Sequence, residues 1–361
     1  MSDTDFQGSR LLTELSEHTS VSWQSPSNIA LVKYWGKTGR QLPVNPSLSM
    51  TLSKAYTETK LTAFPRETEG DVELDFWFEG RQNSAFGDRI SRFLQSVTDI
   101  FPWLAQVSLK LETHNTFPHS AGIASSASAF SALALCLCSL EAELFGILYE
   151  ENEFRFKASY IARLGSGSAC RSLFPGFTVW GLTEALAGSS DLLAMPVDEV
   201  HPVFKTLHDT ILILNNKEKP VSSSEGHNRM IGHPFAEARI GQAVKNTDEL
   251  LRALKSGDKQ TFIRIVENEA FTLHALMMTS DAGFMLMLPE TLRIISRIQE
   301  LRKETGLDIC FTLDAGPNVH LLYFEDQIEQ VQKLIVEDIL KNNKQNMQID
   351  DLYGEGPVKI G

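Results

Sequence analysis

A loop with three serines and one glycine lies between a predicted strand and the most apolar stretch of the chain. Residues 107–111 alternate between apolar and polar side chains, as strands do, and residues 127–144 place apolar side chains at helical spacing. Between them, Pro118–Ser126 carries turn and capping residues. A helix beginning near Ser126 directs its free N–H groups and positive dipole end at this loop, and Gly122 lets a ligand approach the backbone. The segment therefore fits a phosphate site, although a capped structural helix would have the same residues.

The balance of charge limits the partners of the chain. Its 361 residues include 33 Lys and Arg against 46 Asp and Glu, which gives a formal net charge of −13 and a pI of about 5.2. Such an acidic chain is poorly suited to nucleic acid or an anionic membrane, and we expect neither as a partner. The positive charge that an anionic substrate needs must be concentrated in a pocket. A chain of this length is also long for one core, so we expect two lobes.

Cysteine usage and hydropathy bear on the compartment. The four cysteines, Cys136, Cys138, Cys170 and Cys310, form no CxxC pair and have no metal-ligand spacing with the histidines. We expect the first two to be small apolar side chains of a buried helix. The N-terminal residues lack the basic and then apolar order of a signal peptide, and the most apolar run, residues 127–140, is short for a membrane span. The sequence therefore predicts a cytoplasmic protein.

The order of the predicted elements indicates an α+β protein with two lobes. Residues 1–20 are polar and form an N-terminal extension, residues 21–200 form the first lobe and residues 201–361 the second. Strands mixed with helical pairs favour a fold in which motif-bearing loops face a cleft between the lobes. The helices we expect lie near residues 86–100, 126–144, 152–163, 235–255, 258–278, 289–305 and 325–341, and the clearest strands lie at 107–111, 177–180, 210–214, 308–313 and 319–324.

Three further clusters carry side chains suited to an anionic substrate. Residues 166–171 offer backbone N–H groups and, in Arg171, a planar fork that pairs with a carboxylate or phosphate. Lys33 and Lys37 lie among aromatic residues, and a desolvated lysine suits a phosphate. Asp314 ends an apolar strand, where it is either a turn cap or a buried catalytic carboxylate. Each cluster alone also fits an ordinary connection or a solvated surface.

The motifs together resemble one enzyme superfamily. Pro118–Ser126 is similar to the Pro-x-x-x-Gly-x-x-Ser-Ser ATP loop of the superfamily of galactokinase, homoserine kinase, mevalonate kinase and phosphomevalonate kinase (GHMP). Further stretches, in order along the chain, resemble its diphosphomevalonate decarboxylase branch. These stretches are Asn28–Lys37, Asn45–Leu52, Ser166–Phe174, Val221–Ser223, His274–Ser280 and Thr312–Asn318. Each motif is weak alone, but a joint match from about residue 20 to 325 is specific.

The resemblance implies a fold and a reaction. The fold would be that of GHMP kinases, with an N-terminal ribosomal-protein-S5-like lobe, a C-terminal ferredoxin-like lobe and the active-site cleft between them. The reaction would convert (R)-5-diphosphomevalonate and ATP, with Mg²⁺, to isopentenyl diphosphate, ADP, phosphate and CO₂ in the mevalonate pathway of isoprenoid biosynthesis. Because a tertiary hydroxyl is a poor nucleophile and a poor leaving group, the site needs a base and well-positioned phosphates. A homodimer is also implied.

The resemblance further implies roles for individual residues. Asp314 would face the 3-hydroxyl as general base or orienting group, Arg171 would hold the substrate carboxylate, and Lys33 would lie beside Asp314 and keep it ionised. The residues implied in substrate binding, chiefly to its diphosphate, are Ala30, Tyr34, Lys37, Ser166, Gly167, Ser168, Ser222 and Ser223. Those implied for ATP and Mg²⁺ are Pro118, Ser120, Gly122, Ser125 and Ser126, with Ser126 as the candidate metal ligand.

The sequence departs from the family pattern at a few positions. His119 and Ser120 stand where small residues are usual, Pro46 where Ser is common and Pro175 where Gly is common. Four alternatives remain: a decarboxylase of the monophosphate, a mevalonate 3-kinase, a conventional small-molecule kinase of the superfamily and, from another class, a nucleotide-binding regulator without turnover. The complete set of proposed catalytic residues argues against the 3-kinase, and Asp314 argues against the regulator.

Overall fold

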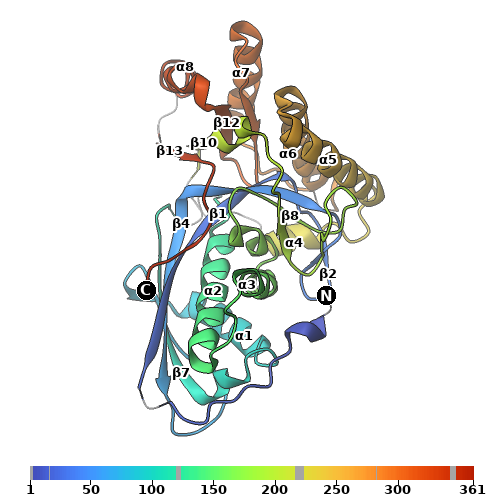
Figure 1. The fold of residues 1–361 in the computed structure, drawn as a ribbon. Coiled ribbons are helices and arrows are strands. Elements are labelled where there is room, and N and C mark those ends of the chain that lie inside the picture. Colours follow the sequence, from blue (N-terminus) through green and yellow to red (C-terminus); the bar gives the residue numbers. More distant parts are fainter. Residues whose placement is uncertain (1–2, 16, 119–122, 216–222, 282, 342–346) are drawn as a thin grey trace.

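Two β-sheets, each covered by helices, divide the chain into two lobes (Figure 1). The computed structural model describes residues 3–15, 17–118, 123–215, 223–281, 283–341 and 347–361. The first sheet has the order β14-β1-β4-β7-β5-β6, and β8 with β9 pairs with the beginning of β4. Its strands are β1 (Thr19–Val32), β4 (Ser47–Pro65), β5 (Glu73–Phe78), β6 (Arg81–Gln82), β7 (Val107–Asn115), β8 (Phe177–Trp180), β9 (Ala194–Pro196) and β14 (Val358–Lys359). A short hairpin of β2 (Lys37–Thr38) and β3 (Leu42–Pro43) stands apart from it.

The core helix of the first lobe is α2 (Ser125–Phe145), which packs on β1 and β4 with α3 (Glu151–Gly165) beside it (Figure 1). The helix is apolar on all sides, as a fully enclosed helix is. By length and composition alone α2 could cross a membrane, but most of its surface is buried in this lobe. Cys136 and Cys138 are buried in it, as expected from the sequence. Helix α1 (Ser84–Ser96) also belongs to this lobe and covers β5.

Hydroxyl pairs connect α2 to the sheet below it. Ser131 Oγ lies 2.6 Å from Ser25 Oγ of β1, and Ser128 Oγ lies 2.6 Å from Thr57 Oγ1 of β4. Ser139 Oγ accepts a hydrogen bond of 2.7 Å from the indole of Trp23. A buried hydroxyl without a partner is costly, so these matched pairs let α2 bury its serines and also fix its register on the sheet.

The second lobe has a four-stranded antiparallel sheet of order β11-β12-β10-β13. Its strands are β10 (Leu207–Ile213), β11 (Cys310–Thr312), β12 (Val319–Phe324) and β13 (Met347–Leu352). Its helices are α4 (Ser223–Asn228), α5 (Ala236–Ser256), α6 (Lys259–Thr279), α7 (Pro289–Thr305) and α8 (Ile328–Leu334). The long helices lie within a few residues of their predicted positions. The predicted helix over 325–341 is wrong in detail, because a 3₁₀ turn precedes α8 and a π-helical turn, Ile335–Ile339, follows it.

The chain changes from one sheet to the other near residue 200, but its end does not stay in the second lobe. In β14, Val358 and Lys359 pair with Gln24 and Trp23 of β1, so the last residues complete the first sheet. The predicted bounds of the second lobe, 201–361, are therefore inexact. The last residues of the chain return to the first lobe and cover the free edge of β1. Within the N-terminal extension, Phe6 stacks on Tyr160 of α3 with 4.1 Å between ring centroids.

A buried carboxylate joins the two sheets where the chain crosses back. Asp351 of β13 accepts hydrogen bonds from three consecutive backbone N–H groups of β4, those of Ser53 (2.7 Å), Lys54 (2.9 Å) and Ala55 (2.7 Å). These groups lie where β4 passes from its pairing with β8 to its pairing with β7. Because the carboxylate satisfies donors that the ladder leaves unpaired, it stabilises both the bend of β4 and the contact between lobes.

We predict that Asp351→Asn lowers the free energy of unfolding by about 2 kcal/mol, because an amide N–H₂ would face a backbone N–H donor in a buried position. Urea denaturation followed by fluorescence measures the change. Asp198→Asn, at an exposed position, is the control and should have little effect. Equal stability of the Asp351 variant and the wild type would contradict the role of this carboxylate.

Candidate active site

A cavity of about 370 Å³ collects most of the residues that the sequence singled out. It is bounded by the end of β1 and the residues after it, the first turn of α2, the loop after α3, α4 and the residues after β11. The predicted site residues that line it are Ala30, Lys33, Tyr34, Lys37, Ser126, Ser166, Gly167, Ser168, Arg171 and Asp314. Both lobes therefore contribute to one site, as expected from the sequence.

Some predicted residues are not placed in this cavity. Ser120, Gly122 and Ser222 lie outside the described residues, as does His119, and the side chain of Ser223 is not described either. Pro118 and Ser125 are described but are not among the residues lining the cavity. Ser125 instead begins α2, where its carbonyl accepts a hydrogen bond from Ser128.

Irregularities in the pairing of β1 with β4 help to direct the last residues of β1 toward the cavity. The register between β1 and β4 shifts between Pro26 and Asn28, where β4 contains the extra residues, and again between Ala30 and Val32, where β1 contains one. An extra residue in a strand bends it and redirects its side chains. Asn28 and Ala30 line the cavity, and the chain then leaves the sheet at Lys33.

Lys33 and Asp314 meet across the boundary between the lobes. Lys33 Nζ lies 3.1 Å from Asp314 Oδ1 and donates a second hydrogen bond of 2.6 Å to the carbonyl of Ala30. The Lys33 side chain is 2% exposed and that of Asp314 is 26% exposed, so the carboxylate is the partner open to a ligand. Burial lowers the pKa of Lys33 from its ordinary value, against the opposing effect of the Asp314 and Glu269 charges. The surroundings of Lys33 thus act in both directions on the protonation of its ammonium group.

Arg171 presents a positive charge that its own contacts leave unpaired. It lies in the 3₁₀ segment Gly167–Leu173 and donates to Ser47 Oγ at 2.7 Å and to Asn28 Oδ1 at 3.4 Å. Its guanidinium carbon is 6.0 Å from the centroid of the Trp180 ring. Among the described residues no carboxylate forms an ion pair with it, so its charge can serve a bound anion.

The loop after α3 is held close to aromatic side chains and to α2. Ser166 Oγ lies 3.3 Å from Ser126 Oγ in the first turn of α2, which joins the two predicted anion loops. A Cβ on Gly167 would lie 2.8 Å from Trp180 and 3.0 Å from the Tyr34 hydroxyl, so only glycine fits here. The Tyr34 hydroxyl is buried and has no hydrogen-bond partner among the described residues. Such an orphaned donor in a cavity fits a site that a polar ligand completes.

The first turn of α2 fits a phosphate group. Its N-cap residue, Ala124, has φ of 42° and no side chain that could accept a hydrogen bond from the helix. A helix start without a capping side chain leaves N–H donors and a positive dipole end for an anion. The described residues contain no cluster of three or more His, Cys, Asp or Glu side chains able to hold a metal. A Mg²⁺ ion here would therefore depend on phosphate oxygens together with a hydroxyl such as that of Ser126.

The structure adds cavity residues that sequence reasoning missed. His227 of α4 packs its ring 4.2 Å from that of Tyr34, and Arg89 of α1 also lines the cavity. The Gly36 N–H donates to His227 Nδ1 at 3.0 Å, so the proton of the neutral ring sits on Nε2. Burial, with the nearby charges of Lys37 and Arg171, lowers the His227 pKa to about 3. No local pattern distinguishes these two residues from surface ones, so only folding reveals them.

Matches to known proteins cover both lobes of the chain. Residues 25–192 match the family model of the diphosphomevalonate decarboxylase-like N-terminal domain, and residues 210–356 match that of the mevalonate 5-diphosphate decarboxylase C-terminal domain. The diphosphomevalonate decarboxylase of Saccharomyces cerevisiae is 31% identical over 323 residues, which cover 85% of this chain and 78% of the yeast protein.

Solved structures show the same fold. Mevalonate diphosphate decarboxylase from Enterococcus faecalis aligns with a TM-score of 0.79 at 28% identity, over 95% of this chain and 99% of that chain. A structure of MDDEF in complex with MVAPP, AMPPCP and magnesium aligns with the same score, identity and coverage. The predicted GHMP-kinase fold is thus confirmed. The chain belongs to the diphosphomevalonate decarboxylase family.

Proposed function

We propose that this protein catalyses the ATP-dependent decarboxylation of (R)-5-diphosphomevalonate to isopentenyl diphosphate, ADP, phosphate and CO₂, as a step of isoprenoid biosynthesis. The observation that carries the proposal is the convergence of Lys33, Arg171 and Asp314 in one cavity. A carboxylate open to the ligand, a buried ammonium beside it and an unpaired guanidinium suit a substrate with a hydroxyl, a carboxylate and phosphates.

Asp314 and Lys33 act at the substrate hydroxyl. The Asp314 carboxylate takes the proton of the 3-hydroxyl as the hydroxyl oxygen bonds to the terminal phosphorus of ATP, and the bond from that phosphorus to ADP breaks. Mg²⁺ bound with ATP would neutralise phosphate charge. Lys33 is 3.1 Å from this carboxylate and offers its ammonium to the negative charge that moves between the groups. The residues therefore supply a base and a charge partner at one point.

Arg171 acts at the other end of the reacting carbon chain. Its guanidinium orients the substrate carboxylate, and its bonds to Ser47 and Asn28 fix the plane of the fork. When the C–O bond to the new phosphate breaks, positive charge develops on C3. The electron pair of the bond to the carboxylate then forms the double bond, and CO₂ leaves.

The diphosphate of the substrate needs several donors. Lys37 and Arg89 supply positive charge at the cavity wall, and Ser166, Gly167 and Ser168 supply hydroxyl and backbone donors. The orphaned hydroxyl of Tyr34 is a further donor, since burial raises its pKa and keeps it protonated. The uncapped start of α2 receives the phosphates of ATP.

An assay of ADP and CO₂ on mevalonate, its monophosphate and its diphosphate tests the proposal. We expect equal amounts of ADP and CO₂ with the diphosphate and far slower turnover with the others. ADP without CO₂ would identify a 3-kinase, and preference for the monophosphate would identify the sister decarboxylase. Nucleotide binding with no turnover of any substrate would indicate a regulator.

We also propose a cytoplasmic, homodimeric protein. The four cysteines are buried and free, which fits a reducing compartment. The homodimer rests on the family resemblance. Light scattering coupled to gel filtration would give twice the chain mass of 40.3 kDa, and the mass of one chain would rule out the dimer.

We predict that Asp314→Asn lowers kcat for ADP and CO₂ release by about 10²- to 10⁴-fold, because the amide cannot accept the hydroxyl proton. Asp308→Asn, just before the same strand β11, is the control and should keep kcat within about 3-fold. Nucleotide binding and thermal unfolding check that the variant remains folded. Near-normal turnover by folded Asp314→Asn would overturn the mechanism.

For Arg171→Lys we predict a loss of about 100-fold in kcat/KM for the diphosphate substrate, because a single ammonium cannot bond to Ser47 and Asn28 and also present a planar fork to a carboxylate. The matched control is Arg155→Lys in α3, whose guanidinium bonds to Glu151 and to the Leu173 carbonyl. Steady-state kinetics measures both. A similar change in the two variants would argue against a specific role of Arg171.

A further inference from the structure

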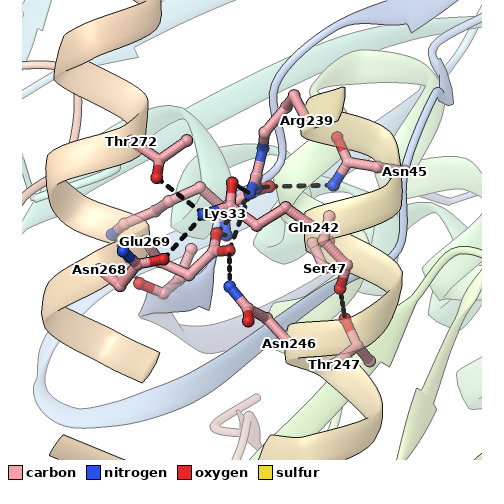
Figure 2. Close-up of polar contacts among 12 residues, drawn as sticks. Lys33, Asn45, Ser47, Arg239, Gln242, Asn246, Thr247, Asn268, Glu269 and Thr272 are labelled. Atoms are coloured by element: carbon pink, nitrogen blue, oxygen red, sulfur yellow. Dashed lines mark hydrogen bonds and ion pairs between the residues drawn. The ribbon is translucent and has the colours of Figure 1, made fainter. Parts of the chain in front are cut away.

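The backbone of Lys33 is held by side chains of the second lobe (Figure 2). Its N–H donates to Glu269 Oε2 at 2.8 Å, and its carbonyl accepts from Arg239 Nη2 at 2.9 Å. Asn45 adds a bond of 3.0 Å to the same carbonyl. Glu269 lies on α6 and Arg239 on α5, so two helices of the second lobe form hydrogen bonds with a residue of the first lobe.

Glu269 and Arg239 form a buried, bidentate ion pair. Arg239 Nη1 lies 2.7 Å from Glu269 Oε1 and Nη2 lies 2.7 Å from Oε2, with side chains 2% and 0% exposed. Asn246 donates a further bond of 2.6 Å to Oε1 (Figure 2). Each carboxylate oxygen thus accepts two hydrogen bonds. We call this pair, with Asn246, the α5–α6 clamp.

A role in stability alone does not explain the clamp. Burying two charges costs free energy that their attraction only offsets, and apolar side chains of the same volume often stabilise as well or better. What apolar residues could not do is bond to both the N–H and the C=O of Lys33. The geometry therefore relates the clamp to the placement of that residue.

Helix α6 also contacts the other member of the catalytic pair. His274, further along α6, donates from Nε2 to the backbone carbonyl of Asp314 at 3.1 Å. The helix thus bonds to the backbone of Lys33 through Glu269 and to that of Asp314 through His274. One helix therefore fixes the backbone positions of both Lys33 and Asp314, although the two residues are 281 positions apart in the sequence.

We propose that Arg239 and Glu269 are positioning residues, which hold the backbone of Lys33 so that its ammonium lies against Asp314. The inference rests on the proposed function, because it gives the clamp a purpose within that reaction. Neither residue lines the cavity, and each acts through Lys33.

The clamp also acts on the charge state of Lys33. The groups whose charges bear on its ammonium are Asp314 after β11, Glu269 on α6 and Arg171 in the 3₁₀ segment, while Arg239 on α5 neutralises Glu269. The Glu269 charge raises the Lys33 pKa, against the effect of burial. Removing that charge lowers the pKa further, so the ammonium is lost at a lower pH.

The test compares two buried glutamates of the same helix. Glu269→Gln keeps the shape of the side chain but removes its charge. Glu267→Gln is the matched control, because Glu267 also forms a bidentate ion pair, with Arg302 at 2.6 and 3.0 Å, and does not contact Lys33. Both variants are examined for kcat, for KM of each substrate, for the pH profile of kcat and for unfolding in urea.

For Glu269→Gln we expect kcat to fall about 10- to 100-fold with KM changed less than about 3-fold, and the alkaline limb of kcat to move to lower pH. Glu267→Gln should lose stability but keep kcat and its alkaline limb. Wild-type kcat and pH profile in Glu269→Gln, or an equal fall in both variants, would overturn the proposal. If Glu269→Gln does not fold, Asn246→Leu removes one bond of the clamp, and wild-type kcat in that variant would count equally against it.

A measurement without turnover separates this proposal from the proposed function. With ¹³C at the lysine ε-carbons, the Lys33 NMR signal is assigned by its loss in Lys33→Arg and then titrated. Its midpoint should move to lower pH in Glu269→Gln and stay in place in Glu267→Gln. If the wild type has no decarboxylase activity but the Lys33 midpoint still moves in Glu269→Gln, the proposed function is rejected and the role of the clamp stands. If the midpoint does not move, the role of the clamp is rejected.

Discussion

The contact between Lys33 and Asp314 is the interaction on which the site depends. A buried ammonium at the end of β1 lies 3.1 Å from a carboxylate after β11, so the two lobes must be correctly packed before the pair exists. Burial works against the charge of Lys33, and Asp314 and Glu269 work for it. The pair is thus a result of the tertiary structure, and it is the pair to which we assign the chemistry of the site.

Positive charge is concentrated at this site although the chain as a whole is acidic. The chain has a net charge of −13, yet Lys33, Lys37, Arg89 and Arg171 all line one cavity. The field of an acidic surface repels anions, so a phosphorylated substrate is bound only where cations are concentrated and partly desolvated. Arg171 bonds to neutral Ser47 and Asn28, which leaves its charge available in that cavity.

Much of the fold could be predicted because its signals are local. Asp258 caps α6, and glycines with positive φ end α5 and α7, so these helices lie close to their predicted bounds. The pairing of β14 with β1 could not be predicted, because two exposed residues carry no pattern that names a strand far away in the sequence.

The sequence by itself determined which residues we propose to carry the chemistry. Lys33, Arg171 and Asp314 stand in motifs whose joint order is specific, and the structure brings them together. Only the tertiary structure decided what surrounds them: the neutral ring of His227, the charge of Arg89 and the Arg239–Glu269 pair that forms hydrogen bonds with the backbone of Lys33. These residues act through contacts between segments far apart in the chain, and such contacts have no signature in any local stretch of sequence.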